Sequence, residues 1–381
     1  MTKDVKKTIL ILSSSFGQGH MATARALESA ANNHPELNID VKIIDFSEEI
    51  GKLFNKTSKK MYEINTKHLP ALYKWMYVST DITHTPIRLA NLLSYPLRQS
   101  HLKKILASHH PDLIISNYPI WQYLAFQISK KNFPHVEFAT LVTDSISVHS
   151  SWVIPDSDFY IVANEPTASS LHTLGVQNDK IHALGYPVHE SFTHDHLSHQ
   201  SILTDINIPK NRKIILFSAS ALRASYVRRV CTAITAQYPD HALVVVTGRD
   251  AELHRQIADS HFWSAPHSYL LGWTNTMPDL IKASDIVITK AGGSTVMECI
   301  AAQKPLIINK IIPGQEEGNA ELVERYQLGH IARKSSEIIT AISEIYKDYG
   351  SYQNRIAQLS KPDAAQAIIE FIAKRLISKP S

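Results

Sequence analysis

The segment from Asp285 to Asn319 constrains the fold more than any other part of the chain. It opens with the apolar run 286–288, which is typical of a buried strand, and then turns at Gly292-Gly293. A helical pattern follows, with Ser294 or Thr295 in a position to cap its first turn. A strand that ends at a glycine pair and feeds a helix presents unpaired backbone N–H groups. The segment is therefore suited to bind a phosphate or diphosphate.

Polar residues around this unit extend the nucleotide interpretation. Glu298 lies one helical turn beyond Ser294, where its carboxylate is placed to accept two ribose hydroxyls. After the strand-like run 306–308, a Pro313-Gly314 turn presents polar side chains that can bond sugar hydroxyls: Gln315, Glu316 and Asn319. An ordinary βαβ unit, whose glycines serve only the turn, is the other interpretation, and spacing alone does not decide between them.

Composition bounds the class of protein. A chain of 381 residues suits two domains, and with 44% hydrophobic and 19% charged residues it can bury substantial cores. The formal net charge of +4 is compatible with a phosphorylated donor or an anionic lipid surface, and we expect no nucleic acid partner. Cys231 and Cys299 have no metal-ligand spacing, so we expect neither a zinc site nor a disulfide framework. Two such cysteines are typical of a protein in a reducing cytoplasm. With no signal peptide pattern and no apolar run near about 18 residues, any membrane association is expected to be peripheral.

The amino-terminal region repeats the strand, glycine turn and helix pattern. The run 8–13 reads as a buried strand, the sequence GQGH follows at 17–20, and a helical pattern begins at Met21. This arrangement opens a doubly wound α/β domain, and the absence of GxGxxG spacing argues against a nicotinamide cofactor. At a helix start the dipole disfavours the protonated ring, so His20 is a candidate base. A single histidine at such a position is otherwise more often a cap or a surface residue.

Residues 51–106 combine many aromatic and aliphatic side chains with ten lysines and arginines, among them Trp75, Tyr77 and Lys103. One interpretation is a pair of surface helices whose apolar stripe faces the core. The other is an amphipathic insertion that lies in an anionic membrane interface, and the sequence alone leaves both open.

Four motifs carry a family resemblance: GQGH, the TD pair at 143–144 with a spaced His149 and Trp152, TKAGGSTVMECI at 289–300 and IIPGQEEGN at 311–319. Together they resemble the monogalactosyldiacylglycerol synthase and processive diacylglycerol glucosyltransferase family. That family is related to the enzyme that adds N-acetylglucosamine to the peptidoglycan lipid intermediate. The resemblance extends over about residues 9–328, with the motifs in the expected order.

The resemblance implies a fold of two Rossmann-like domains that face a central cleft. Residues 1–195 would form the acceptor and membrane-binding domain, residues 205–362 the UDP-sugar-binding domain, and residues 363–381 a terminal helix that crosses back to the first domain. It further implies an inverting hexosyltransferase that moves glucose or galactose from a UDP-sugar to diacylglycerol without a metal or other cofactor. The product would be a β-glycosyl diacylglycerol, made at the cytoplasmic side of the membrane.

The same resemblance assigns roles to individual residues. His20 would be the base, with Asp144 as its alternate or helper. Acceptor binding would fall to Gly17, Gly19, His149 and Trp152. Donor binding would fall to Ser218, Trp273, Lys290, Gly292, Gly293, Ser294, Thr295, Glu298, Gln315, Glu316 and Asn319. Trp273 would pack on uracil, although a core tryptophan is an equal alternative, and His149 and Trp152 would otherwise be a turn and a packing residue.

One departure from the family and three alternatives remain at this point. Related enzymes have a glycine-rich loop where this chain has Ser218–Arg223, so only serine hydroxyls and backbone N–H groups are available there. The alternatives are N-acetylglucosamine transfer to a polyprenyl-diphosphate lipid, a UDP-sugar 2-epimerase, and a UDP-sugar sensor without activity. The aromatic and basic region 51–106 favours the diacylglycerol acceptor over the first of these.

Overall fold

The computed structural model describes residues 6–15, 19–50, 75, 77–81, 99–192, 203–209, 211–259 and 266–378. The chain divides into two compact units. The first consists of Met1–Glu190, Pro313–Gly318 and Asp363–Ser381, and the second of Ser191–Ile312 and Asn319–Pro362. The turn that carries Gln315 and Glu316 therefore belongs to the first unit, whereas the sequence analysis placed it in the donor-binding domain.

The first unit is built on a six-stranded parallel sheet with the order β2-β1-β3-β4-β5-β6. Its strands are β1 (Lys7–Ser13), β2 (Ile39–Asp45), β3 (Leu113–Ser116), β4 (Glu137–Leu141), β5 (Phe159–Ile161) and β6 (Ile181–His182). Its α-helices are α1 (Gly19–Asn33), α2 (Phe46–Ile50), α6 (Pro119–Asn132), α7 (Glu165–Thr173) and α16 (Ala364–Ile377). Short 3₁₀ turns occur at η1 (Pro35–Leu37), η2 (Ser150–Trp152), η3 (Asn178–Lys180) and η4 (Glu190–Phe192), and residues 99–109 are also helical. Every residue of β3 and β4 is buried, as expected for parallel strands covered on both faces.

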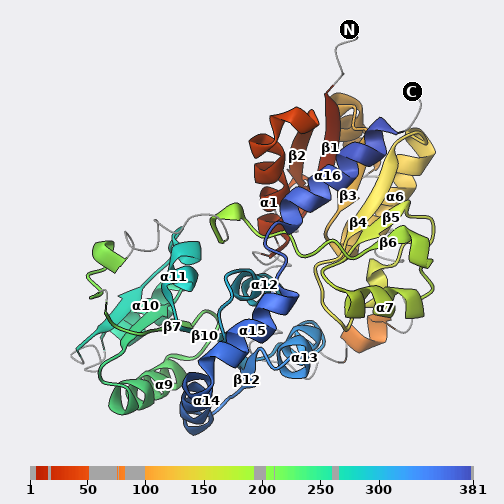
Figure 1. The fold of residues 1–381 in the computed structure, drawn as a ribbon. Helices are drawn as coiled ribbons and strands as arrows, with labels where there is room; N and C mark the ends of the chain where they lie inside the picture. The colour runs from red at the N-terminus through yellow and green to blue at the C-terminus, as the bar shows by residue number, and fades with distance from the viewer. Residues whose placement is uncertain are drawn as a thin grey trace. The chain divides into compact units, whose positions relative to one another are not determined.

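The second unit contains a second six-stranded parallel sheet, with the order β12-β11-β10-β7-β8-β9. Its strands are β7 (Ile214–Ser218), β8 (Ala242–Val246), β9 (Ser268–Leu271), β10 (Ile286–Lys290), β11 (Leu306–Lys310) and β12 (Gly329–Ile331). The helices are α9 (Ala224–Gln237), α10 (Ala251–Ala258), α11 (Met277–Ala283), α12 (Gly293–Ala301), α14 (Ser335–Lys347) and α15 (Tyr349–Leu359), and α13 (Glu317–Arg325) begins in the PGQEEG turn (Figure 1). The predicted fold class, two doubly wound α/β domains, is confirmed.

Both sheets have a position where the strand order reverses direction. It lies between β1 and β3 in the first unit and between β7 and β10 in the second. In open parallel sheets ligands bind outside the carboxyl ends of the strands at this reversal. His20 follows β1 and the Gly292-Gly293 pair follows β10. The two glycine motifs found in the sequence therefore lie at the two positions where this topology favours ligand binding.

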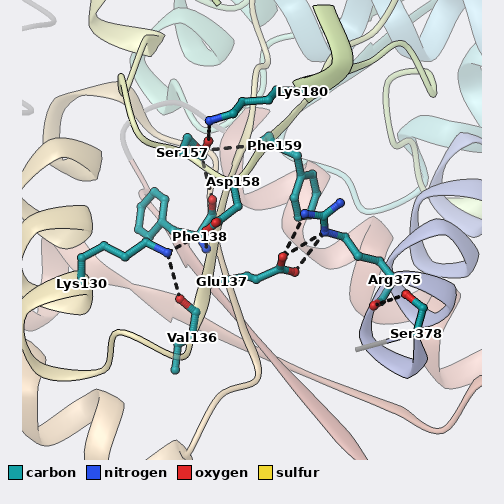
Figure 2. A network of polar contacts seen from close by, with 10 residues as sticks. All are labelled: Lys130, Val136, Glu137, Phe138, Ser157, Asp158, Phe159, Lys180, Arg375 and Ser378. Carbon is teal, nitrogen blue, oxygen red and sulfur yellow. Dashed lines mark hydrogen bonds and ion pairs between the residues drawn. The ribbon is translucent and has the colours of Figure 1, made fainter. Parts of the chain in front are cut away.

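The last helix, α16, is part of the first unit and packs against α1 and the sheet (Figure 1). Arg375 of this helix forms a bidentate ion pair with Glu137, with distances of 2.9–3.1 Å, and its guanidinium lies 4.7 Å from the ring centroid of Phe159 (Figure 2). Glu137 is only 3% exposed. Because a buried carboxylate needs a partner, this pair ties the end of the chain to the first strand positions of β4 and β5. Within the described residues, no helix is long and apolar enough to cross a membrane.

Candidate active site

His20 is held firmly in the first turn of α1, at the reversal point of the first sheet. Its backbone carbonyl accepts hydrogen bonds from Asn117 Nδ2 (2.6 Å) and Thr23 Oγ1 (2.8 Å). Its ring nitrogen Nδ1 pairs with Thr143 Oγ1 at 3.1 Å, and the ring packs edge-on against Tyr118 with centroids 5.1 Å apart. Asn117 and Tyr118 follow β3, so both strands at the reversal contribute to fixing the imidazole.

The environment of His20 keeps its ring neutral. Burial lowers the pKa of His20 to about 4, and a hydrogen bond between the ring and the backbone of Asn117 opposes this only in part. The sequence analysis expected a neutral ring because of the helix dipole, and the larger cause is desolvation. Among the residues that the structure describes, Thr143 is the one whose side chain bonds to the ring. Where Nδ1 donates to Thr143, the lone pair of the neutral ring lies on Nε2.

Asp144 follows Thr143 in the loop after β4, but it contacts a different residue. Its Oδ2 accepts a hydrogen bond of 2.7 Å from Trp152 Nε1. Burial raises the pKa of Asp144 to about 6, and the bond from Trp152 opposes that shift. The residue that touches the ring of His20 is Thr143, so any help from Asp144 does not pass through a direct hydrogen bond. Sequence reasoning missed the role of Thr143, although it is the first residue of the TD pair.

Two predicted acceptor residues serve the protein interior instead. Trp152 is fully buried in the core beside β4 and β5 and offers no surface to an acceptor, although its ring lies 6.3 Å from that of His20. His149 is 5% exposed and caps η2, with Nδ1 accepting from the N–H of Ser151 (3.0 Å) and Nε2 donating to the carbonyl of Tyr77 (3.1 Å). The expectation that they line the acceptor pocket is wrong, because both side chains are committed to packing and capping.

The remaining acceptor predictions are described only in part. Gly17 lies outside the described residues, and Gly19 is the first residue of α1. Most of the predicted amphipathic region 51–106 also lies outside the described residues, including 51–74 and 82–98. In the helical residues 75 and 77–81, Trp75 is 68% and Val78 is 42% exposed. Residues 99–109 pack into the first core through three buried side chains: Leu102, Ile105 and Leu106.

The second unit presents an anion-binding helix start at its own reversal point. Helix α12 begins at Gly293 with Gly292 as its N-cap, so the prediction that Ser294 or Thr295 caps the helix is wrong. Both hydroxyls instead lie in the first turn, beside the N–H groups that an anion would contact. Asn319, expected to bond the sugar, is 4% exposed and donates from Nδ2 to the carbonyl of Ala291 at 3.0 Å. It therefore holds the glycine turn in place.

Two lysines add positive charge to this edge of the second sheet. Lys290 and Lys310 are paired neighbours at the carboxyl ends of β10 and β11, next to an irregularity in the ladder. Lys310, which the sequence analysis did not select, donates to the carbonyl of Ala221 at 2.8 Å. Ala221 has φ +61°, in the left-handed region that favours glycine. The loop after Ser218, the last residue of β7, thus makes a glycine-type turn without a glycine.

Glu298 and Trp273 have the surroundings that ligand-binding side chains require. Burial raises the pKa of Glu298 to about 7, and in the described part of the chain its carboxylate has no hydrogen-bond or ion-pair partner. Trp273 is 58% exposed, and the guanidinium of Arg249 lies 5.3 Å from its ring centroid, so the core alternative is wrong. In the PGQEEG turn, Gln315 is partly exposed and Glu316 is 4% exposed. Glu316 therefore offers little surface to a sugar in this conformation.

Two doubly wound units define the class as a fold of two Rossmann-like domains, which glycosyltransferases and UDP-sugar epimerases share. Comparison with solved structures gives the same fold. A UDP-GlcNAc 2-epimerase from Neisseria meningitidis has a TM-score of 0.60 at 13% identity, with 97% of this chain and 100% of that chain covered. A glycosyltransferase from Rickettsia africae has a TM-score of 0.56 at 14% identity, with 98% and 100% covered.

Two family models match successive parts of the chain. A model described as monogalactosyldiacylglycerol (MGDG) synthase matches residues 20–188, and one described as the glycosyltransferase family 28 C-terminal domain matches residues 219–369. A processive diacylglycerol beta-glucosyltransferase of Staphylococcus carnosus is 28% identical over 360 residues, which is 93% of this chain and 88% of the relative. The chain therefore carries an MGDG synthase match followed by a family 28 C-terminal match, which agrees with the resemblance of its motifs.

Proposed function

We propose that this protein transfers a hexose from a UDP-sugar to the hydroxyl of diacylglycerol, with inversion at the anomeric carbon. The observation that carries the proposal is His20, a neutral imidazole fixed by Thr143 through Nδ1 at the strand-order reversal of the first sheet. Relatives that match 93% of the chain are named β-glucosyltransferases, which makes glucose the first sugar to test.

The acceptor chemistry requires a base because an alcohol is a poor nucleophile while it keeps its proton. The acceptor oxygen forms a bond to the anomeric carbon as its proton passes to Nε2 of His20, and the bond from that carbon to the UDP oxygen breaks. UDP leaves with the bonding electron pair. Because the pKa of His20 is about 4, it is a weak base, and we expect proton transfer to accompany bond formation rather than to precede it.

Asp144 is the alternate base. Its pKa of about 6 leaves it ionised at neutral pH and closer to the optimum for a general base. One carboxylate oxygen is held by Trp152, which fixes the orientation of the group. Replacing His20 and Asp144 one at a time distinguishes the two candidate bases, because replacement of the true base should lower kcat far more than replacement of the other residue.

On the donor side, negative charge develops on the diphosphate as it leaves. The start of α12 and the neighbouring Lys290 and Lys310 supply backbone dipoles and positive charge for it. We propose that these groups replace a divalent ion, that Glu298 accepts the ribose hydroxyls, and that Trp273 packs on uracil. Each ribose hydroxyl would find in Glu298 an acceptor that has no competing partner in the described structure.

We also propose that the protein works on the cytoplasmic face of a membrane as a peripheral enzyme, since its acceptor is a membrane lipid. Trp75 and Val78, three positions apart on one helical segment, expose an apolar face of the type that enters a membrane interface. An anionic membrane surface would complement the net charge of +4.

The test supplies purified protein with liposomes that contain diacylglycerol and with UDP-glucose, UDP-galactose or UDP-N-acetylglucosamine, with and without EDTA. We expect lipid-dependent UDP release and a glycolipid product with one hexose donor, unaffected by EDTA. His20→Ala should lose about 10²- to 10⁴-fold in kcat while it still binds UDP. UDP release or epimerisation without lipid, or UDP binding without turnover in the wild type, would refute the proposal.

A further inference from the structure

We infer that Tyr77 and the loop Asp144–Ser147 are positioning elements that hold the PGQEEG turn, Pro313–Gly318, in the geometry that recognises the donor sugar. This inference deepens the proposed function and rests on it for the identity of the donor. All three elements belong to the first unit. The turn therefore takes its shape from the unit that carries His20, while the chain resumes in the second unit at Asn319.

The first contact joins Tyr77 to Gly314. Gly314 has φ +85°, and a Cβ placed on it would lie 2.7 Å from Cδ1 and 2.9 Å from Cγ of Tyr77. No real side chain tolerates such distances, so the ring of Tyr77 covers the backbone of the turn directly. Tyr77 is itself fixed, because its carbonyl accepts from Nε2 of His149 and the two rings pack edge-on with centroids 4.5 Å apart.

The next segment of the same helix is fixed as well. Asp81 Oδ1 accepts the N–H of Ser150 at 2.6 Å, and the hydroxyl of Ser150 donates to the carbonyl of Asp81 at 2.8 Å. The helical residues 77–81 are thus attached to the loop at His149–Ser150 on one side and cover Gly314 on the other.

The second contact joins the loop after Asp144 to Gly318. A Cβ on Gly318 would lie 1.9 Å from the carbonyl oxygen of Ser145 and 2.8 Å from the nitrogen of Ser147. These atoms are backbone and cannot move aside as a flexible side chain would. The N–H of Ser147 also bonds to the carbonyl of Ser145 at 2.6 Å, which makes the loop a tight turn around Ile146.

Ile146 shows that this loop is held in an unfavourable shape. Its φ of +57° lies in the left-handed region, where a β-branched residue is strained by about 1–3 kcal/mol. Helix α7 enforces the conformation, because Thr167 Oγ1 accepts the N–H of Ile146 at 3.0 Å and the hydroxyl of Ser170 donates to its carbonyl. Strain of this kind persists only where surrounding contacts determine it, and here it places the backbone of 145–147 against Gly318.

The two contacts hold both ends of the turn that presents Gln315. One end is held by the segment attached to His149, and the other by the loop that continues from Thr143 and Asp144. A shift of either contact would therefore move the sugar-recognising side chain without touching the nucleotide-binding residues of the second unit.

The experiment compares the binding of UDP and UDP-glucose by calorimetry in Tyr77→Ala, Tyr77→Phe and Gly314→Ala, with Gly175→Ala as the matched control. Gly175 also has positive φ (+95°) in the first unit but nothing within 4 Å of its would-be Cβ, so it reports backbone strain alone. We expect Tyr77→Ala and Gly314→Ala to change the ratio of the two dissociation constants about tenfold, with the dissociation constant of UDP unchanged. Tyr77→Phe keeps the ring and should keep the wild-type ratio, as should Gly175→Ala.

A double variant adds a readout that a merely structural role would not move. Tyr77→Ala removes the ring with which the new methyl group of Gly314→Ala would clash. The double variant should therefore change the ratio of the two dissociation constants by less than the product of the two single-variant changes. The inference would be overturned if Gly314→Ala and Gly175→Ala had the same ratio of UDP to UDP-glucose dissociation constants. It would also be overturned if the affinities for UDP and UDP-glucose fell in parallel. These binding measurements need no lipid, so failure of the positioning role is distinguishable from failure of glycolipid synthesis in the wild type.

Discussion

The raised pKa of Glu298 leads to a prediction that links the stability of the protein to its binding of UDP. An ordinary glutamate has a pKa of 4.5, whereas burial raises that of Glu298 to about 7. Each pKa unit corresponds to about 1.4 kcal/mol, so at pH 8 the ionised carboxylate opposes folding by about 3 kcal/mol. Because the side chain keeps some contact with solvent, we expect about 2–3 kcal/mol.

The sign of the effect follows from the direction of the shift. A raised pKa means that the folded state binds the proton more tightly than the unfolded chain does, so stability is lost as pH rises through about 7. Glu298→Gln removes this loss and should stabilise the ligand-free protein by about 2–3 kcal/mol at pH 8. At pH 4.5 the wild type is mostly protonated at this position when folded, so the gain should fall below about 1 kcal/mol.

The assay is denaturant unfolding of both proteins at pH 4.5 and pH 8, together with calorimetric titration of UDP at pH 8. The same substitution should weaken UDP binding about tenfold, because a neutral amide replaces a charged acceptor of two ribose hydroxyls. Glu324→Gln, on an exposed glutamate of the second unit, is the control and should change neither quantity. A loss of stability at pH 8, or a gain that is equal at both pH values, would refute the reasoning.

Three further predictions test other parts of the molecule. Trp152→Phe removes the hydrogen bond that lowers the pKa of Asp144, so the midpoint of the acidic limb of the pH–rate profile should move upward from about 6. An unchanged midpoint would show that this limb does not report the titration of Asp144. Arg375→Ala leaves the carboxylate of Glu137 buried without its ion-pair partner, so it should lower the free energy of unfolding by about 3 kcal/mol. Adding Glu137→Gln to that variant should restore part of the lost free energy, in a double-mutant cycle measured by denaturant titration. Trp273→Ala should weaken UDP by about 1–3 kcal/mol while the free energy of unfolding stays within about 0.5 kcal/mol, because the ring is exposed, and equal losses in both would restore the core interpretation.

Much of the fold was determined by local sequence signals. Short apolar runs such as 8–13 and 286–288 are typical of buried strands, and each is followed by glycine and then a helical pattern, which indicates a doubly wound parallel sheet. The motifs at GQGH and TKAGGSTVMECI also lie at the strand-order reversals of the two sheets. These inferences succeeded because strand, turn and helix start are properties of neighbouring residues.

The tertiary structure alone decided which side chains meet. Thr143, rather than Asp144, reaches the ring of His20, and Trp152 is buried where it orients Asp144 instead of lining a pocket. The contact between Thr143 and His20 joins residues more than a hundred positions apart, and no periodicity reports it. Nor does any periodicity report that the amide of Asn319 donates to the carbonyl of Ala291.

The sequence by itself determined two α/β domains, the family motifs and their places at the strand-order reversals of the two sheets. Only the tertiary structure decided that the PGQEEG turn belongs to the first unit and is shaped by Tyr77 and by a strained Ile146. The physical reason is that a turn's own residues fix its local type. Its placement depends on the distant backbone against which Gly314 and Gly318 pack.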